Sequence, residues 1–212
     1  MSRQQHWNTV YSTKAEREVS WFEPRADVSL EMIEAAGLGR DSCVIDVGGG
    51  ESRLVDALID RGVTCIAVLD VAREALLRAQ ARLGGRAADV AWIQADVTSM
   101  WSWKDVDIWH DRAVFHFLTD PADREKYKER LVEHVQPGGT VIIATFALEG
   151  PGKCSGLPVM RYSPQTLASE LGDQFTLVEV RPHLHTTPWG ATQAFQYSRF
   201  RRVPNPESRV PA

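Results

Sequence analysis

Cysteine is scarce in this sequence, with three residues in 212, at positions 43, 65 and 154. The number is odd, and Cys43 and Cys65 lie inside short apolar runs. So sparse a set excludes a fold stapled by disulfides and predicts reduced thiols. Reduced thiols in turn indicate a reducing, cytoplasmic compartment.

An excess of basic charge and long apolar runs are also missing. The chain has 24 Lys and Arg residues against 28 Asp and Glu residues, a formal net charge of −4. Without a basic field that releases counterions, a dedicated nucleic-acid binder is disfavoured, and we predict no nucleic-acid partner. Residues 1–6 lack the apolar core of a signal peptide, and the apolar runs are only a few residues long, so we expect no membrane association.

What is present is the composition of one globular domain, with 43% apolar residues. A chain of this size buries roughly 70% of its unfolded surface. Residues 1–26 are polar with isolated aromatics, which predicts a helical N-terminal segment that packs on the domain or covers it. Residues 27–202 form the predicted domain, and residues 203–212, with three prolines and no periodic pattern, form a predicted disordered tail.

Short apolar runs alternate with amphipathic stretches along most of the chain. The runs predict buried strands at 43–47, 63–69, 90–93, 106–109, 140–146, 175–180 and 191–200. Caps, helical periodicity and stop residues predict helices at 27–37, 52–61, 72–83, 120–136 and 163–171. No helix separates the last two strands. The predicted fold is therefore α/β, a doubly wound, mostly parallel seven-stranded sheet with an antiparallel C-terminal hairpin.

A glycine-rich turn, residues 46–50, follows the first strand. A dinucleotide fingerprint needs a third glycine at position 53, but Arg53 stands there, which argues against a bound pyrophosphate. Asp70, 20 residues beyond Gly50, ends the second strand and suits the hydroxyls of a ribose. The residues thus indicate an adenosine ligand without a pyrophosphate, while a plain connecting turn and a helix N-cap at Asp70 stay open as alternatives.

Several further motifs follow in order along residues 27–200. They are Val44 to Gly50, Asp70, Asp96-Val97, Asp107 to Asp111, Pro137 to Ile143 and the closing hairpin. Each motif alone is weak, but the set in this order resembles the class I S-adenosylmethionine-dependent methyltransferases. The resemblance implies S-adenosylmethionine as the cofactor.

The resemblance also implies cofactor-binding roles for eight residues, namely Asp46, Gly48, Gly50, Asp70, Val71, Asp96, Val97 and His110. Asp70 is expected to bind both ribose hydroxyls and Asp96 the adenine amino group, with Val71 and Val97 on the two faces of the ring. The glycines pass beneath the methionine and ribose portions, the aspartate before them braces the turn, and His110 approaches the methionine amino group. A surface turn is the open alternative for Asp96.

Loops that follow the parallel strands emerge at one edge of the sheet, where we expect the acceptor pocket. The candidate catalytic residues are His116, His185 and Asp111, the last also a candidate for the methionine amino group. His116 is either a base or a structural histidine. His183 and His185 share a face if their strand continues through them, and with Cys154 they suggest an alternative metal site. Their spacing is not a recognised zinc pattern, so we predict no bound metal.

The leading functional prediction is a cytoplasmic enzyme that methylates a small-molecule acceptor, because the chain is too short for an added recognition domain. A protein lysine methyltransferase is the first alternative, suggested by His6-Trp7 and Ser20-Trp21-Phe22 near the N-terminus. A non-catalytic cofactor-binding module is the second. The sequence does not indicate whether oxygen, nitrogen or sulfur accepts the methyl group, nor the oligomeric state.

Overall fold

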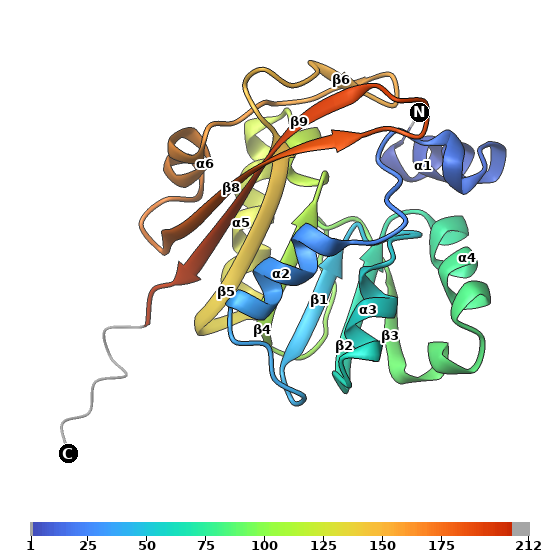
Figure 1. Ribbon diagram of the computed structural model, residues 1–212. Helices are drawn as coiled ribbons and strands as arrows, with labels where there is room; N and C mark the ends of the chain where they lie inside the picture. The colour runs from blue at the N-terminus through green and yellow to red at the C-terminus, as the bar shows by residue number, and fades with distance from the viewer. Residues whose placement is uncertain (1, 205–212) are drawn as a thin grey trace.

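The computed structural model describes residues 2–204, and its centre is one seven-stranded sheet (Figure 1). The strands lie in the order β3-β2-β1-β4-β5-β9-β8. Their bounds are β1 Cys43–Val47, β2 Cys65–Asp70, β3 Val90–Gln94, β4 Val106–Arg112, β5 Val135–Phe146, β8 Phe175–Thr186 and β9 Thr192–Arg202. Strands β3, β2, β1, β4 and β5 are parallel, whereas β9 is antiparallel to both β5 and β8. The predicted fold class is confirmed.

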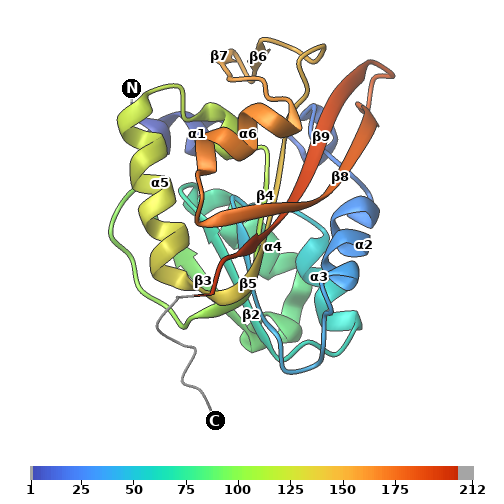
Figure 2. The ribbon, with the colours of Figure 1, turned by 90° about the vertical axis from the view of Figure 1, so that its left-hand side faces the viewer.

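Helices cover both faces of the sheet (Figure 2). The helices are α1 Arg3–Thr13, α2 Asp27–Ala35, α3 Leu54–Asp60, α4 Arg73–Leu83, α5 Pro121–His134 and α6 Pro164–Leu171. Short 3-10 turns are η1 Glu16–Glu18, η2 Gly84–Asp89 and η3 Phe115–Phe117, and a small separate ribbon is formed by β6 Lys153–Cys154 and β7 Leu157–Pro158. Of these helices, none is long and apolar enough to cross a bilayer within residues 2–204.

Two apolar layers follow from the alternation of side chains along the central strands. Val44 of β1 packs with α2, α3 and α4 in one cluster, while its neighbour Ile45 packs with α5 and α6 in the other. Successive residues of a strand point to opposite faces, so a continuous apolar run fills both layers. Both side chains are completely buried.

The largest departures from the predicted strand bounds are in β8 and β5. Strand β8 continues through Pro182 to Thr186, because it is the edge strand of the sheet and a missing N–H is tolerated there. Strand β5 begins at Val135, directly after α5, rather than after the glycines at 138 and 139. Most of the predicted disordered tail, residues 205–212, lies outside the described residues, but Val203 donates its N–H to the Gln174 carbonyl at 2.9 Å.

The prediction of three reduced cysteines is wrong for two of them. Cys43 and Cys65 are the first residues of neighbouring parallel strands, and their register pairs them directly. Their Cα atoms are 4.6 Å apart, within the range that a disulfide spans, and the two residues are bonded. Sequence spacing alone does not reveal this register. The thiol argument for a reducing compartment therefore fails, and cytoplasmic localisation stays a prediction.

We expect the Cys43–Cys65 bond to stabilise the fold, because it closes a loop with a sequence separation of 22 residues. The chain-entropy relation gives about 3 kcal/mol for such a loop. Urea unfolding with and without a reductant measures the difference in the free energy of unfolding. A Cys154→Ser variant retains the effect of the reductant and Cys43→Ser loses it; equal stability of the wild-type protein in both conditions would contradict the expectation.

Candidate active site

The turn after β1 has a backbone that only glycine adopts easily. Gly48 and Gly50 have φ values of +65° and +47°. A Cβ on Gly48 would lie 2.0 Å from a methyl carbon of Val114, and one on Gly50 would lie 2.8 Å from the Tyr11 hydroxyl. The Gly48 N–H donates to the Leu69 carbonyl at 2.7 Å, which fixes the turn against β2. The turn therefore presents bare backbone between the N-terminal segment and the loop after β4.

Asp46 lies just before this turn and is almost completely buried. Its Oδ1 atom is 2.7 Å from Nδ1 of His110, whose Nε2 atom is 2.9 Å from the Ser29 hydroxyl. The Oδ2 atom of Asp46 has no hydrogen-bond partner within the described residues. Since a Cβ on Gly49 would lie 2.6 Å from this atom, the carboxylate is pressed against the turn that it supports. Asp46 and His110 form one buried polar pair on adjacent strands.

Asp70 ends β2 and is also buried. Burial raises the pKa of its carboxyl to about 7, and the nearby Asp46 adds to this, although hydrogen bonds from backbone N–H groups act against the rise. The Ala72 N–H donates to Oδ1 at 2.7 Å, directly before helix α4. Through Oδ1 the carboxylate thus supports the start of that helix. Its other oxygen, Oδ2, faces the glycine turn, 3.1 Å from the position that a Cβ on Gly50 would occupy. A structural role and a binding role are compatible here.

A cavity, called the main cavity below, opens where these strands end. Residues of the sheet edge and the following loops line one side of it: Val47, Gly48, Leu69, Asp70, Val71, Ala95, Asp96, Val97, Arg112, Ala113, Val114, Phe117 and Leu118. Arg3, Trp7, Tyr11 and Trp21 of the N-terminal segment, with Cys154, line the remainder. The wall of this cavity is mainly apolar, with a few convergent charged groups, as ligand pockets typically are.

The N-terminal segment covers this cavity with interlocking aromatic rings. The Trp7 ring lies edge-on to Trp21 at 5.6 Å and to Phe117 at 5.1 Å between centroids. Tyr11 lies 6.3 Å from Trp21. Helix α1 also packs beside α4 at the carboxyl end of the sheet (Figure 1). The segment therefore belongs to the site rather than to a separate unit.

Asp96 lies after β3, on the wall of the main cavity. It accepts hydrogen bonds from the Thr98 N–H at 2.9 Å and from Arg3 Nη1 at 3.1 Å. Burial acts to raise its pKa, but Thr98 and Arg3 outweigh burial and lower it. Arg3 also pairs with Asp123 on α5. The residue predicted to bind adenine is thus an ionised acid that already holds the N-terminal segment.

The structure gives Asp111 and His116 positions that do not favour catalysis. Asp111 is completely buried and accepts from the N–H groups of Val114 and Phe115, at 2.9 and 3.1 Å, and from the Tyr127 hydroxyl at 2.7 Å. Burial raises its pKa to about 6. Asp111 thus caps the 3-10 turn η3, and it does not line the main cavity.

His116 is equally enclosed. Its ring centroid lies 4.6 Å from that of Phe117 and 4.8 Å from that of Phe146, and the imidazole is fully buried. Burial, together with the charge of Arg112, lowers its pKa to about 3. The residue is absent from the lining of the main cavity. Of the two interpretations left open, the structure favours the structural histidine.

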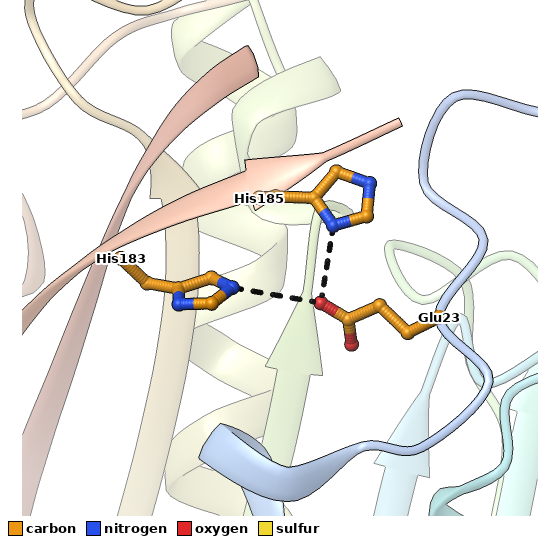
Figure 3. Close-up of side chains that lie close together, drawn as sticks. All are labelled: Glu23, His183 and His185. Atoms are coloured by element: carbon orange, nitrogen blue, oxygen red, sulfur yellow. Dashed lines mark ion pairs between the residues drawn. The ribbon is translucent and has the colours of Figure 1, made fainter. Parts of the chain in front are cut away.

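His183 and His185 do share a face, because β8 continues through both, as the sequence suggested. Their partner is Glu23 rather than Cys154 (Figure 3). Glu23 Oε1 lies 3.4 Å from His185 Nδ1 and 3.9 Å from His183 Nε2. Cys154 lines the main cavity instead, and burial raises the pKa of its thiol to about 11. Sequence reasoning missed Glu23, which carries no motif and lies 160 residues from His183.

Arg112 is the second residue that sequence reasoning missed. It ends β4 and donates to the Trp21 carbonyl at 3.0 Å, to Glu23 at 2.8 Å and to the Tyr197 hydroxyl at 3.0 Å. Its guanidinium also lies 4.8 Å from the centroid of the Phe195 ring. Its position directly after Asp111 was the only available signal. Arg112 fastens the N-terminal segment to the sheet at the cavity wall.

Comparisons with known proteins agree with this architecture. Residues 44–139 match the methyltransferase domain family. No curated protein matches the sequence. Together with the sheet order, the family match defines the class: the chain is an S-adenosylmethionine-dependent methyltransferase, with S-adenosylmethionine as its methyl donor. The predicted family, enzyme class and cofactor are confirmed.

Three solved structures illustrate the likeness of the fold. One comes from a study of the conversion of a disulfide bond into a thioacetal group during echinomycin biosynthesis, with a TM-score of 0.76, 19% identity and coverage of 98% of this chain and 95% of that chain. The N-methyltransferase NodS from Bradyrhizobium japonicum, in complex with S-adenosylhomocysteine, has a TM-score of 0.71 and 16% identity, with coverage of 95% of this chain and 99% of that chain. The 1,6-didemethyltoxoflavin-N1-methyltransferase from Burkholderia thailandensis has a TM-score of 0.68 and 18% identity, with coverage of 94% of this chain and 87% of that chain.

A Tyr127→Phe substitution tests the structural role of Asp111. It removes the hydroxyl that donates to Asp111 and accepts from the Trp109 ring N–H at 2.9 Å. We expect the free energy of unfolding to fall by roughly 1–3 kcal/mol, because two buried polar groups lose a partner. Urea unfolding measures the loss, and calorimetry with S-adenosylhomocysteine is expected to give an unchanged dissociation constant. Unchanged stability with lost cofactor affinity would contradict the structural role.

Proposed function

We propose that this enzyme transfers the methyl group of S-adenosylmethionine to a small-molecule acceptor bound in the main cavity. The observation that carries the proposal is the cover of the cavity by the N-terminal segment, through Trp7, Tyr11 and Trp21. A site covered in this way is better suited to a small acceptor that fits inside it than to a lysine side chain on the surface of a folded protein. Among the structural neighbours, the Burkholderia enzyme has 1,6-didemethyltoxoflavin bound, which supports a small acceptor.

The residues at the sheet edge fit the cofactor. Asp70 would accept hydrogen bonds from both ribose hydroxyls, and Val71 and Val97, both on the cavity wall, would contact the adenine faces. Asp96 would accept from the adenine amino group beside Arg3, because a carboxylate offers about four lone pairs. Gly48 places the backbone of the turn on the wall of the main cavity, where the ligand would contact it directly because no side chain intervenes.

The methionine portion carries a positive ammonium and a sulfonium. A second cavity, which shares Tyr11, Trp21 and Gly48 with the main one, is lined by Asp46 and His110. The unpartnered Oδ2 atom of Asp46 is the acceptor that an ammonium would satisfy. His110 would not contact the ammonium directly. It would position the Asp46 carboxylate through its contact with the other oxygen, Oδ1.

When bound, the cofactor supplies an activated methyl group for in-line displacement. The chain's own contribution is to hold the acceptor near 3 Å from that methyl carbon and to exclude water. Of the three candidate catalytic residues, only His185 stays a proposal. It lines neither cavity itself, but it contacts Glu23, which lines the second cavity and pairs with Arg112. Asp111 and His116 would act by supporting the loop after β4. The transfer thus depends mainly on positioning.

A labelling experiment tests the proposed acceptor class. Incubation of the enzyme and tritiated S-adenosylmethionine with a cell extract is expected to place label in low-mass material. Asp70→Asn is expected to lose most of this label, while the exposed acid variant Asp173→Asn keeps it. Label confined to protein would contradict the proposal and favour the lysine alternative.

The pKa of Asp70 predicts a pH dependence of cofactor affinity. Hydroxyl donors favour the ionised carboxylate, which is the minor form below a pKa of about 7. Affinity for S-adenosylhomocysteine is therefore expected to rise roughly eightfold from about pH 6 to about pH 7.5. Calorimetry at several pH values measures the change. Asp70→Asn is expected to bind weakly and with no such dependence, so an equal slope in the variant would contradict the assignment.

A further inference from the structure

Two histidines and one glutamate meet beside the cofactor cavities without belonging to the cofactor-binding set. Glu23 comes from the connection between η1 and α2, and His183 and His185 come from β8 (Figure 3). One ligand atom from each residue lies within 4.8 Å of the other two. Figure 3 shows both imidazole rings turned toward the same carboxylate oxygen.

We propose that Glu23, His183 and His185 form a binding site for one divalent transition metal ion, and that Zn²⁺ suits it well. Two imidazole nitrogens and a carboxylate oxygen are a common zinc ligand set, which leaves a fourth position for water. Zinc bonds of about 2.0–2.1 Å to tetrahedral ligands place those ligand atoms roughly 3.3 Å apart. The 3.4 Å between Glu23 and His185 already matches this spacing, and the 3.9 Å to His183 requires only a small side-chain rotation.

The hydrogen bond on the far side of His185 orients the ring for a metal. Its Nε2 atom lies 2.6 Å from the Ser20 carbonyl oxygen, which can only accept, so Nε2 carries the hydrogen. In the neutral ring, Nδ1 then directs its lone pair at Glu23 Oε1. Metal-binding histidines commonly donate their other N–H to a backbone carbonyl in this manner.

The shielding of these groups from solvent favours a cation between them. The His185 side chain is 3% exposed and that of Glu23 is 18% exposed. A lone pair and a carboxylate oxygen at 3.4 Å repel each other unless a cation lies between them, either a metal ion or a proton on Nδ1. Arg112 binds the same Glu23 oxygen at 2.8 Å from the side of β4, as outer partners of ligating carboxylates do.

The site would join two parts of the chain that are far apart in sequence. Glu23 follows the segment that covers the main cavity, while His183 and His185 lie on the edge strand. A metal ion bound by all three would hold the covering segment to β8. Glu23 also lines the second cavity, which shares Gly48 and Trp21 with the main one, so the ion would lie close to the reaction site.

Metal titration of the chelator-treated, full-length protein without cofactor tests the proposal. Co²⁺ replaces zinc in such sites and absorbs visible light strongly when few ligands surround it. We expect one Co²⁺ per chain with this absorption. We also expect Zn²⁺ at a hundredfold excess over its dissociation constant to raise the thermal midpoint by about 5 °C or more.

Matched variants separate this site from other binding. His183→Asn and Glu23→Gln are expected to lose the Co²⁺ absorption and the thermal shift, while the control His6→Asn, a half-buried histidine outside the cluster, keeps both. His183 is itself partly exposed, so its substitution leaves the core intact. Absence of stoichiometric binding by the wild-type protein, which leaves a proton as the cation between Glu23 and His185, would overturn the proposal. Binding that survives both substitutions would overturn it as well.

Discussion

The left-handed glycine turn after β1 is the constraint on which the rest of the site depends. Gly48 fits against Val114 from the loop after β4, and Gly50 fits beneath Tyr11 and beside Asp70. Any side chain at these positions would push apart elements from three regions of the chain. Because β1 pairs in parallel with both β2 and β4, the carboxyl ends of the three strands share one edge. A ligand at this edge would meet the backbone of the turn on one side and acidic side chains on the other.

The N-terminal segment completes this edge through pairs that are individually modest. Arg3 reaches Asp96, and Glu16 pairs with Arg53, the residue that replaces a dinucleotide-binding glycine. These partly exposed pairs contribute little each, but the contact between Glu23 and the half-buried Arg112 is better shielded from solvent. Together with the aromatic contacts of Trp7, they make the segment part of the binding site. The same segment also places Glu23 beside His183 and His185 of β8.

The sequence was sufficient for the fold and for the backbone of the site, but not for which way side chains face. Continuous apolar runs identified the parallel strands, and a strand end located Asp70 at the edge where the main cavity opens. Spacing did not reveal that Asp111 turns inward to cap η3. Nor did it reveal that Cys43 and Cys65 become neighbours, because strand register is a property of the assembled sheet. Glu23 was missed for a similar reason, since only tertiary packing brings it to β8.

We propose above all that S-adenosylmethionine lies across the ends of β1 and β2 with its ribose on Asp70. A crystal structure of the complex with S-adenosylhomocysteine tests this most directly. We expect both ribose hydroxyls to lie within hydrogen-bond distance of the Asp70 carboxylate and the adenine ring to lie between Val71 and Val97. A ligand bound with its ribose away from Asp70, or outside the main cavity, would contradict it.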